Sequence, residues 1–259
     1  MSINKLIYHY TSIDTLALIL STKKIRFNRL DKVDDVLESS LLNESRYVFV
    51  SCWTKTCTEN IALWYMYAKN MKGIRISFPS NPFKKHLIKK GRYGKISVNQ
   101  DIVDSPMTIG ELFNEKYFIF PIIEKDDFFK PVIYLKENEL ESTFNEIVDR
   151  RGKNITLYTE KLGFVKHERW QFQDESRFVL KITPPYKDAR NLIKEFNSNV
   201  PSPLEYFDLS MDLNEFSKIE VKLGPHCSEA DKIIVNSLLK SHGVDKLCTE
   251  SNLKGIIRK

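Results

Sequence analysis

The sequence predicts a single α/β domain, and three patterns carry that prediction. YVFVSCW (47–53) and IRISFP (74–79) have the composition of buried strands, and ENIALWYMYAK (59–69) between them has the spacing of an amphipathic helix. Two strands that bracket one helix favour a sheet that is covered on at least one face. The chain has 259 residues, 42% of them apolar, so one large domain can bury a substantial core.

The N-terminal elements follow from alternation and capping. KLIYHY (5–10) predicts a short strand, and Thr11 or Ser12 can cap a helix through IDTLALILS (13–21). IRFNR (25–29) alternates between apolar and polar residues and predicts a further strand.

The rest of the chain divides into a middle region and a C-terminal region. Residues 100–160 are expected to be an insertion, with helices at 109–117 and 136–150, into a domain that spans residues 1–259. The C-terminal elements predicted are strands at 175–182 and 218–225, a helix at 228–243 between the N-cap Ser228 and Gly243, and short strands over VDKLC and KGIIRK.

Composition and charge restrict the functional class. No run of about 18 apolar residues occurs, which predicts no membrane span. The N-terminus MSINKLIYHYTS has no apolar signal core, so a cytoplasmic protein is expected. The net charge is +6, and the basic excess gathers in a basic segment made of Lys84, Lys85, Lys89, Lys90, Arg92 and Lys95. This segment is either a solvated face or a contact for nucleic acid or phosphate.

Several common catalytic motifs are absent. The sequence has no G-x-x-x-x-G-K-[ST] loop, no G-x-G-x-x-G turn and no G-x-S-x-G elbow, and its five histidines are scattered. These absences argue against phosphate-loop NTPases, Rossmann dehydrogenases, serine hydrolases and zinc hydrolases. The four cysteines form no C-x-x-C pair, so reduced thiols and no metal site are expected.

Two groups of residues in the first third of the chain are candidates for a site. His9 lies on the first predicted strand, where it is either a structural residue or a neutral imidazole that holds a ribose hydroxyl. Ser51, Trp53, Trp64 and Tyr67 form the second group. Helical spacing fits Trp64 to the core, whereas an aromatic wall would stack on nicotinamide or a base, a contact worth roughly 1–3 kcal/mol for a base.

The third group lies in HERWQFQDESRFVL. Strand alternation places Gln173, Glu175 and Arg177 on one face. A carboxylate and a guanidinium on one face are often an exposed ion pair, which contributes about 0–1 kcal/mol. Alternatively, a glutamate framed by Trp170 and Phe172 can support chemistry on a sugar ring, where positive charge develops at the anomeric carbon.

Taken together, these segments resemble an uncharacterised bacterial family of domains of unknown function. In chain order the matching segments are IYHYTS-x-x-TLALIL, IRFNRLDKVDDVLE, SCWT, LWYMYA, GIRISF, W-x-F-Q-x-E-x-R and VKLGPHCSE. The chain departs from the family pattern at two places. DDVLE (34–38) stands where the family tends to have Asn-Asp-Pro-x-Glu, and Gln173 replaces the first Glu of a W-x-Y-E-x-E-x-R pattern.

A more distant resemblance concerns function. IYHYTSIDTLALIL is similar to the first strand and helix of ADP-ribosyltransferases, especially the DarT-like toxins that modify DNA. This resemblance implies a split mixed sheet with flanking helices and a triad that is spread over three strands. His9 matches the first triad position and Glu175 the third, while Ser51, Trp53 and Tyr67 are alternatives for the second. Gln173-x-Glu175 is similar to the Gln-x-Glu turn of many such transferases.

The resemblance therefore implies an NAD-dependent ADP-ribosyltransferase, a glycosyltransferase that consumes NAD as its substrate and needs no metal. Glu175 and His9 would be catalytic, Trp64 or Tyr67 would stack on nicotinamide, and Arg26 or Arg29 would neutralise the pyrophosphate. The full set of residues expected to contact NAD is His9, Tyr10, Thr11, Arg26, Arg29, Ser51, Trp53, Trp64, Tyr67 and Gln173. A role as a bacterial toxin or anti-phage defence effector, with an antitoxin or defence-system partner, is also implied.

Two alternatives stay open from the sequence. The first is a binding module that recognises a nucleotide or nucleic acid without turnover. The second is a metal-independent nuclease toxin that uses His9 and Glu175 as acid and base. The acceptor of a transferase would be DNA, RNA, protein or water, and the sequence favours none of them.

Overall fold

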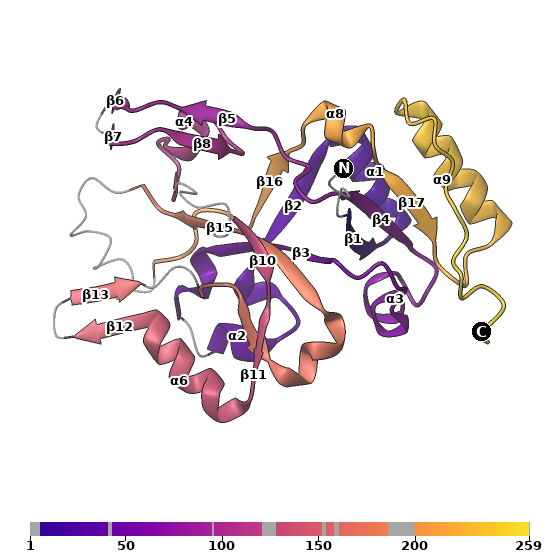
Figure 1. The fold of residues 1–259 in the computed structure, drawn as a ribbon, viewed down its shortest axis with the longest axis horizontal. Coiled ribbons are helices and arrows are strands. Elements are labelled where there is room, and N and C mark those ends of the chain that lie inside the picture. Colours follow the sequence, from indigo (N-terminus) through magenta and orange to yellow (C-terminus); the bar gives the residue numbers. More distant parts are fainter. Residues whose placement is uncertain are drawn as a thin grey trace, which may run out of the picture.

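A computed structural model describes residues 6–40, 43–94, 96–120, 128–151, 154–157, 161–185 and 200–258 (Figure 1). The α/β class expected from the sequence is confirmed, since a nine-stranded sheet packs against several helices. The strands of this sheet are β1 (Leu6–Thr11), β2 (Lys24–Arg29), β3 (Val48–Thr54), β4 (Ile74–Pro79), β9 (Phe118–Ile119), β10 (Phe129–Pro131), β15 (Glu175–Thr183), β16 (Tyr206–Ser210) and β17 (Glu220–Leu223). In the described part of the chain, no helix combines the length and apolar character needed to cross a membrane.

The large sheet is open along part of one edge of β3. The main strand order is β10-β15-β3-β1-β4-β17, and β2 pairs with both β3 and β16. β3 pairs with β15 along its whole length, but on its other edge it meets β1 only at Thr54 and β2 only at Phe49 and Val50. Within the described residues, positions 51–53 therefore have no strand partner on that edge, which we call the open edge of β3.

Strand direction differs from the expectation of a mixed sheet. Every pairing within the nine-stranded sheet is antiparallel. Parallel pairing joins β11 (Ile133–Leu135) to β14 (Val165–His167) in a separate two-stranded sheet, and an isolated parallel bridge joins Lys222 to Thr249. The other small sheets pair β5 (His86–Ile88) with β8 (Ile102–Ser105), β6 (Gly91–Tyr93) with β7 (Ile96–Val98), and β12 (Val148–Arg151) with β13 (Asn154–Leu157).

Capping residues set the helix ends near the predicted positions. The Ser12 side chain accepts from the Thr15 amide at the start of α1, and Ser228 forms a reciprocal capping box with Asp231 at the start of α9. Gly243 follows α9 with a positive φ of 76°, which favours glycine. The helices are α1 (Ile13–Thr22), α2 (Val36–Ser40), α3 (Ile61–Tyr67), α4 (Ile109–Leu112), α6 (Glu137–Ile147), α8 (Leu213–Phe216) and α9 (Glu229–Ser241), and the 3₁₀ helices are η1 (Leu30–Lys32), η2 (Asn43–Tyr47) and η3 (Glu168–Gln173).

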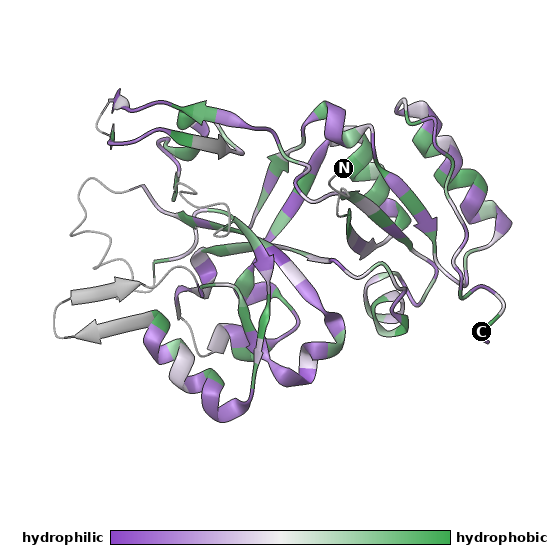
Figure 2. Cartoon of the chain, in the orientation of Figure 1, coloured by the Kyte–Doolittle hydropathy of each residue, from purple (hydrophilic) through white to green (hydrophobic). Residues whose placement is uncertain are grey.

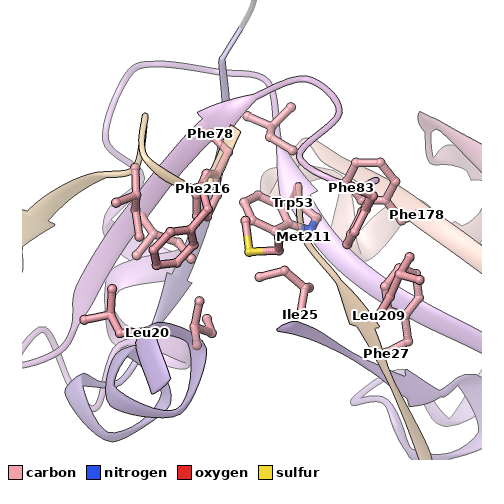
Figure 3. Packing of buried hydrophobic residues seen from close by; sticks show 14 of the residues in the cluster. Leu20, Ile25, Phe27, Trp53, Phe78, Phe83, Phe178, Leu209, Met211 and Phe216 are labelled. Atoms are coloured by element: carbon pink, nitrogen blue, oxygen red, sulfur yellow. The ribbon is translucent and has the colours of Figure 1, made fainter. Parts of the chain in front are cut away.

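The two faces of β3 and β15 contact different hydrophobic clusters. Trp53 and Phe178 point into the largest cluster, which also contains Phe78 and Phe83 and packs α1 and α9 against the sheet (Figure 3). Val50 and Val179 lie on the other face in a second cluster, which is closed by α6 and the residues around β14. Because successive strand residues alternate between faces, neighbours on β3 contribute to different clusters.

Two sequence predictions near the C-terminus were wrong. VDKLC and the described part of KGIIRK, residues 254–258, form no strand, and beyond α9 the described residues make one isolated bridge, between Thr249 and Lys222. Instead, the last segment turns over α3, where Leu253 and Ile257 pack against a third cluster around Tyr10 and Trp64. Figure 2 shows that α9, which precedes this segment, alternates hydrophobic and hydrophilic residues, and it buries Val235 and Leu239 against the sheet.

The middle region contains less helix than predicted. The helix expected at 109–117 ends at Leu112, because Phe113 leaves it to form a bridge with Phe118. The helix expected at 136–150 is α6, which ends at Ile147 and continues directly into β12. Parts of residues 100–160 lie outside the described residues, and their description as an insertion stays a prediction.

Candidate functional site

A cavity of about 480 Å³ lies beside the open edge of β3. This volume falls within the range of about 300–1,000 Å³ that is typical of small-molecule sites. Its wall is built from β1, α1, β2, β3 and β15, with further contributions from α3, β14 and η3. The predicted site residues that line it are His9, Tyr10, Thr11, Arg26, Ser51, Trp53, Tyr67, Gln173 and Glu175.

His9 bridges the gap where β1 and β3 separate. Its Nδ1 lies 2.8 Å from the backbone oxygen of Cys52, and because a carbonyl can only accept, Nδ1 carries the proton and donates. Burial lowers the pKa of His9, although the hydrogen bond to Cys52 acts in the opposite direction. The imidazole is therefore neutral at pH 7, and its Nε2, which has no partner among the described residues, is an acceptor beside the cavity.

Glu175 belongs to a buried group of four charged side chains, which we call the charge cluster: Glu38, Lys166, Glu175 and Arg177. Arg177 binds Glu175 through Nε–Oε1 at 2.6 Å and Nη2–Oε2 at 3.1 Å, and it holds Glu38 with its two terminal nitrogens at 2.5 and 2.9 Å. Lys166 lies 3.4 Å from Glu175 and 3.6 Å from Glu38. Each of the four residues is at most 6% exposed, so the expectation of an exposed ion pair was wrong.

The charge cluster keeps Glu175 ionised. Burial raises the pKa of Glu175, but the positive charges of Arg177 and Lys166 and the hydrogen bonds to the carboxylate outweigh it, and together they lower that pKa to about 2. Two carboxylates and two cations balance each other, which is the condition under which charges are tolerated inside a protein. The result is a permanent carboxylate in the wall of the cavity.

Gln173 and Tyr67 extend the charge cluster by a chain of hydrogen bonds. Lys166 donates to Oε1 of Gln173 at 2.8 Å, Nε2 of Gln173 donates to the Tyr67 hydroxyl at 2.7 Å, and that hydroxyl donates to Asp34 at 2.8 Å. Burial and the hydrogen bond to Asp34 raise the pKa of Tyr67, so its hydroxyl stays protonated. Both ends of the Gln173 amide are thereby occupied, and its orientation is fixed.

His9 and Glu175 line the same cavity from the two faces of β3. The His9 ring lies 5.1 Å from the Trp53 ring, on the side of the largest hydrophobic cluster. Glu175 pairs with Thr54 and Arg177 with Cys52, which places the carboxylate on the opposite side of the strand. The cavity reaches both because the edge of β3 is unpaired there. No contact joins the two side chains within the described residues, so they do not form an acid–base pair.

Two predicted NAD contacts, Trp64 and Arg29, lie outside the cavity wall. Trp64 is 0% exposed and packs edge-on against Tyr10, with its Nε1 donating to Glu59, as the core interpretation requires. Arg29 is held by Asp31 and Glu205. Arg26 does line the cavity, but its guanidinium already forms a two-point ion pair with Asp208.

Sequence reasoning missed several residues that shape this site. Glu38 and Lys166 complete the charge cluster around Glu175 and Arg177, and Asp34 orients Tyr67. The acidic residues at 34–38 were a usable signal, because they were noted as a segment of the family pattern. Lys166 gave no signal in the sequence. It is a single lysine between Val165 and His167, and its burial depends on tertiary contacts.

The fold and cavity define a mixed α/β protein with a small-molecule-sized site that has a buried carboxylate in its wall. Residues 63–178, a little under half of the chain, match the model of a family described as a protein of unknown function (DUF2971), which confirms the resemblance to such an uncharacterised family. The matched part carries Tyr67, Lys166, Gln173, Glu175 and Arg177, whereas His9 and Glu38 precede it. No curated protein and no solved structure matches the chain.

Proposed function

We propose that the cavity binds NAD and that the protein transfers ADP-ribose from it to an acceptor. The observation that carries this proposal is a carboxylate, Glu175, that is held ionised inside a cavity that also contains a neutral imidazole and aromatic side chains. A fixed negative charge in the wall of a site is suited to stabilise a cation that develops during a reaction. The resemblance of the N-terminal segment to ADP-ribosyltransferases supplies the substrate.

In the proposed reaction the bond between the ribose C1′ and the nicotinamide nitrogen breaks, and nicotinamide leaves with the bonding electrons. The oxocarbenium-like sugar that forms is stabilised by Glu175, whose carboxylate lies in the cavity wall. An acceptor nucleophile then bonds to C1′ and releases its proton to solvent. His9 would hold a ribose hydroxyl through Nε2, which is an acceptor because Nδ1–H is committed to Cys52.

The phosphates of NAD need cations, and two lysines of the cavity wall are candidates. Lys24, the first residue of β2, and Lys32, which follows the other end of that strand, have no ion-pair partner among the described residues, unlike Arg26 and Arg29. The pyrophosphate would lie against one of these lysines, with nicotinamide towards Trp53 and Tyr67. Trp53 is 3% exposed and its Nε1 donates to Ser51, so its ring is already fixed before a ligand arrives.

The proposed biological role, as a toxin or anti-phage effector, rests on the same resemblance. The basic segment indicates which class of acceptor the protein would bind. Lys84, Lys85, Lys89, Lys90 and Arg92 are exposed and form no ion pair within the described residues, while Lys95 lies outside them. Such a surface suits a polyanionic acceptor such as DNA or RNA.

One observation favours a second function, nucleotide binding without turnover. The Glu175 carboxylate already accepts from Arg177, Lys166 and Cys52, which uses most of its hydrogen-bonding capacity. A glutamate whose hydrogen bonds are already made to the protein would shape the cavity wall without taking part in a reaction of the ligand. The nuclease alternative has less support, because a carboxyl with a pKa of about 2 is a weak general base and cannot serve as an acid near pH 7.

Paired measurements of binding and turnover test the proposal. Nicotinamide release would be followed by chromatography with wild-type protein, Glu175→Gln and Glu175→Asp, at a temperature where all are folded, while NAD binding is measured by calorimetry. We expect release to fall by about 10²–10³ in Glu175→Gln, with binding changed far less. Glu137→Gln is the matched control, because it makes the same chemical change in an exposed ion pair, between Glu137 and Arg169. If the wild type binds NAD but releases no nicotinamide, the binding module is supported. If it shows no NAD binding and no nicotinamide release, both proposals are overturned.

A further inference from the structure

Arg75 is a buried cation on the face of β1 and β4 that points away from the largest hydrophobic cluster. It is the second residue of β4, directly across from Tyr10 on β1 and Lys222 on β17. Only 6% of the residue is exposed. The guanidinium lies against the ring of Tyr8, 4.6 Å from its centroid, with the ring of Tyr10 at 5.7 Å.

The partners of this guanidinium do not balance its charge. Nη1 donates to the backbone oxygen of Cys57 at 2.9 Å and to the Tyr10 hydroxyl at 3.4 Å. Nε and Nη2 donate to nothing among the described residues, and no carboxylate there lies within ion-pair distance. A charge that is removed from water without a counterion is costly, so such an arginine is unusual unless an anion reaches it.

The neighbouring carboxylates are already committed to other groups. Glu59 accepts from Lys222, Trp64, Ser251 and Asn252. Glu220, the nearest acidic residue along β17, binds Lys246 and Ser77. Arg75 is also directly opposite Lys222, and like charges at such positions repel. An added anion would relieve that repulsion.

A second unused donor lies beside Arg75. The hydroxyl of Tyr8 has no hydrogen-bond partner within the described part of the chain, and Tyr8 is only half-buried. The free Nε and Nη2 atoms of Arg75 are not among the fully enclosed polar atoms that lack a partner, so solvent reaches them. Adjacent Nε–H and Nη2–H groups form the fork that binds two oxygens of one oxyanion.

We propose that Arg75 and Tyr8 form an oxyanion site for a phosphate group, on the opposite face of β1 from His9. Tyr8 also belongs to the cavity wall, whereas Arg75 does not, and the proposal does not depend on NAD turnover. The phosphate would be free or carried by a nucleotide or nucleic acid, since all three present the same two-oxygen edge to the guanidinium. Lys222, on the neighbouring strand, is already paired with Glu59, so Arg75 is the cation that the site offers.

Binding of inorganic phosphate, a nucleoside monophosphate and a short oligonucleotide to the full chain tests the site. Calorimetry would compare wild-type protein with Arg75→Met, which keeps an apolar stem and removes the charge, and with Tyr8→Phe, which removes only the hydroxyl. We expect phosphate affinity to fall by about tenfold to a hundredfold in Arg75→Met and by a smaller factor in Tyr8→Phe. Arg169→Met is the matched control, because Arg169 is an exposed arginine paired with Glu137 and its loss should leave the affinity unchanged.

Each result decides the proposal. Chloride at equal ionic strength separates specific phosphate binding from screening. Tighter binding of the nucleotide or the oligonucleotide than of free phosphate identifies the carrier when Arg75→Met removes the difference. If phosphate does not bind to the wild type more tightly than chloride, or binds equally well to Arg75→Met, the site does not exist. If Arg75→Met fails to fold, two other variants decide the proposal. Arg75→Lys keeps the charge but loses the fork, and Tyr8→Phe loses the hydroxyl. Both must weaken phosphate binding for the proposal to stand.

Discussion

Glu175→Gln is the substitution that tests the charge cluster most directly. It preserves the shape of the side chain and removes one of the two negative charges that balance Arg177 and Lys166. Glu38 remains, so two buried cations would face a single carboxylate, all at most 6% exposed. Removing one partner of a buried ion pair typically costs about 3–5 kcal/mol.

The pKa of Glu175 gives an independent magnitude. It is about 2 in the folded protein and about 4.3 in an unfolded chain, a difference of roughly 2.3 pH units, or roughly 3 kcal/mol. Because the folded-state pKa is the lower one, this contribution is fully present above about pH 4.3 and is lost as the pH falls through about 2. Glutamine mimics the protonated acid, so the difference from wild type should be largest near pH 7 and should shrink below pH 4.

Urea denaturation of wild type and Glu175→Gln at pH 7, 5, 4 and 3 measures this difference. At pH 7 we expect a loss of roughly 3 kcal/mol, equivalent to a decrease in Tm of roughly 6–12 °C for a chain of this size. Glu137→Gln, in an exposed pair with Arg169, should lose about 0–1 kcal/mol. A loss below about 1 kcal/mol in Glu175→Gln at pH 7, or a loss that stays constant between pH 5 and pH 3, would refute the reasoning.

Three further predictions concern the rest of the site. His9→Asn can still donate to the Cys52 oxygen and should stay within about 1 kcal/mol of wild type, whereas His9→Ala strands that carbonyl and should lose about 1–3 kcal/mol on denaturation. Burial lowers the pKa of His9 in the folded protein, so as the pH falls below about 6.5 the His9 imidazole is protonated in the unfolded chain first. The wild type should therefore lose more stability than His9→Asn between pH 7 and pH 5. Trp64→Ala should cost about 3–5 kcal/mol in denaturation experiments but leave nicotinamide release per folded molecule unchanged, because Trp64 is core and does not line the cavity. Charge reversal at Lys89 and Lys90 should weaken DNA or RNA binding and flatten its salt dependence in titrations, and an absence of such binding in the wild type would mark the basic segment as a solvated face.

Local signals in the sequence predicted most of the elements that form the cavity. Alternation and capping placed β1, α1, β2, β3 and β4 within about one residue, since these patterns depend on neighbours in the chain. The same signals failed at VDKLC, whose Val244 and Cys248 join the largest cluster, and at KGIIRK, whose Ile257 packs on the third cluster from an irregular segment. Its anchor is Glu59, which contacts Ser251 and Asn252 almost two hundred residues away.

What the sequence alone determined was which segments could contribute to a site: the strand that carries His9, the strand that carries Ser51 and Trp53, and the strand that begins at Glu175. Only the tertiary structure decided how these side chains are used. Strand pairing leaves the edge of β3 open and directs His9 to the Cys52 carbonyl. The same packing encloses Glu175 with Arg177, Lys166 and Glu38 and turns an apparent surface pair into a buried charge cluster. The physical reason is that burial and charge balance depend on residues that lie far apart in the chain, and no local pattern records them.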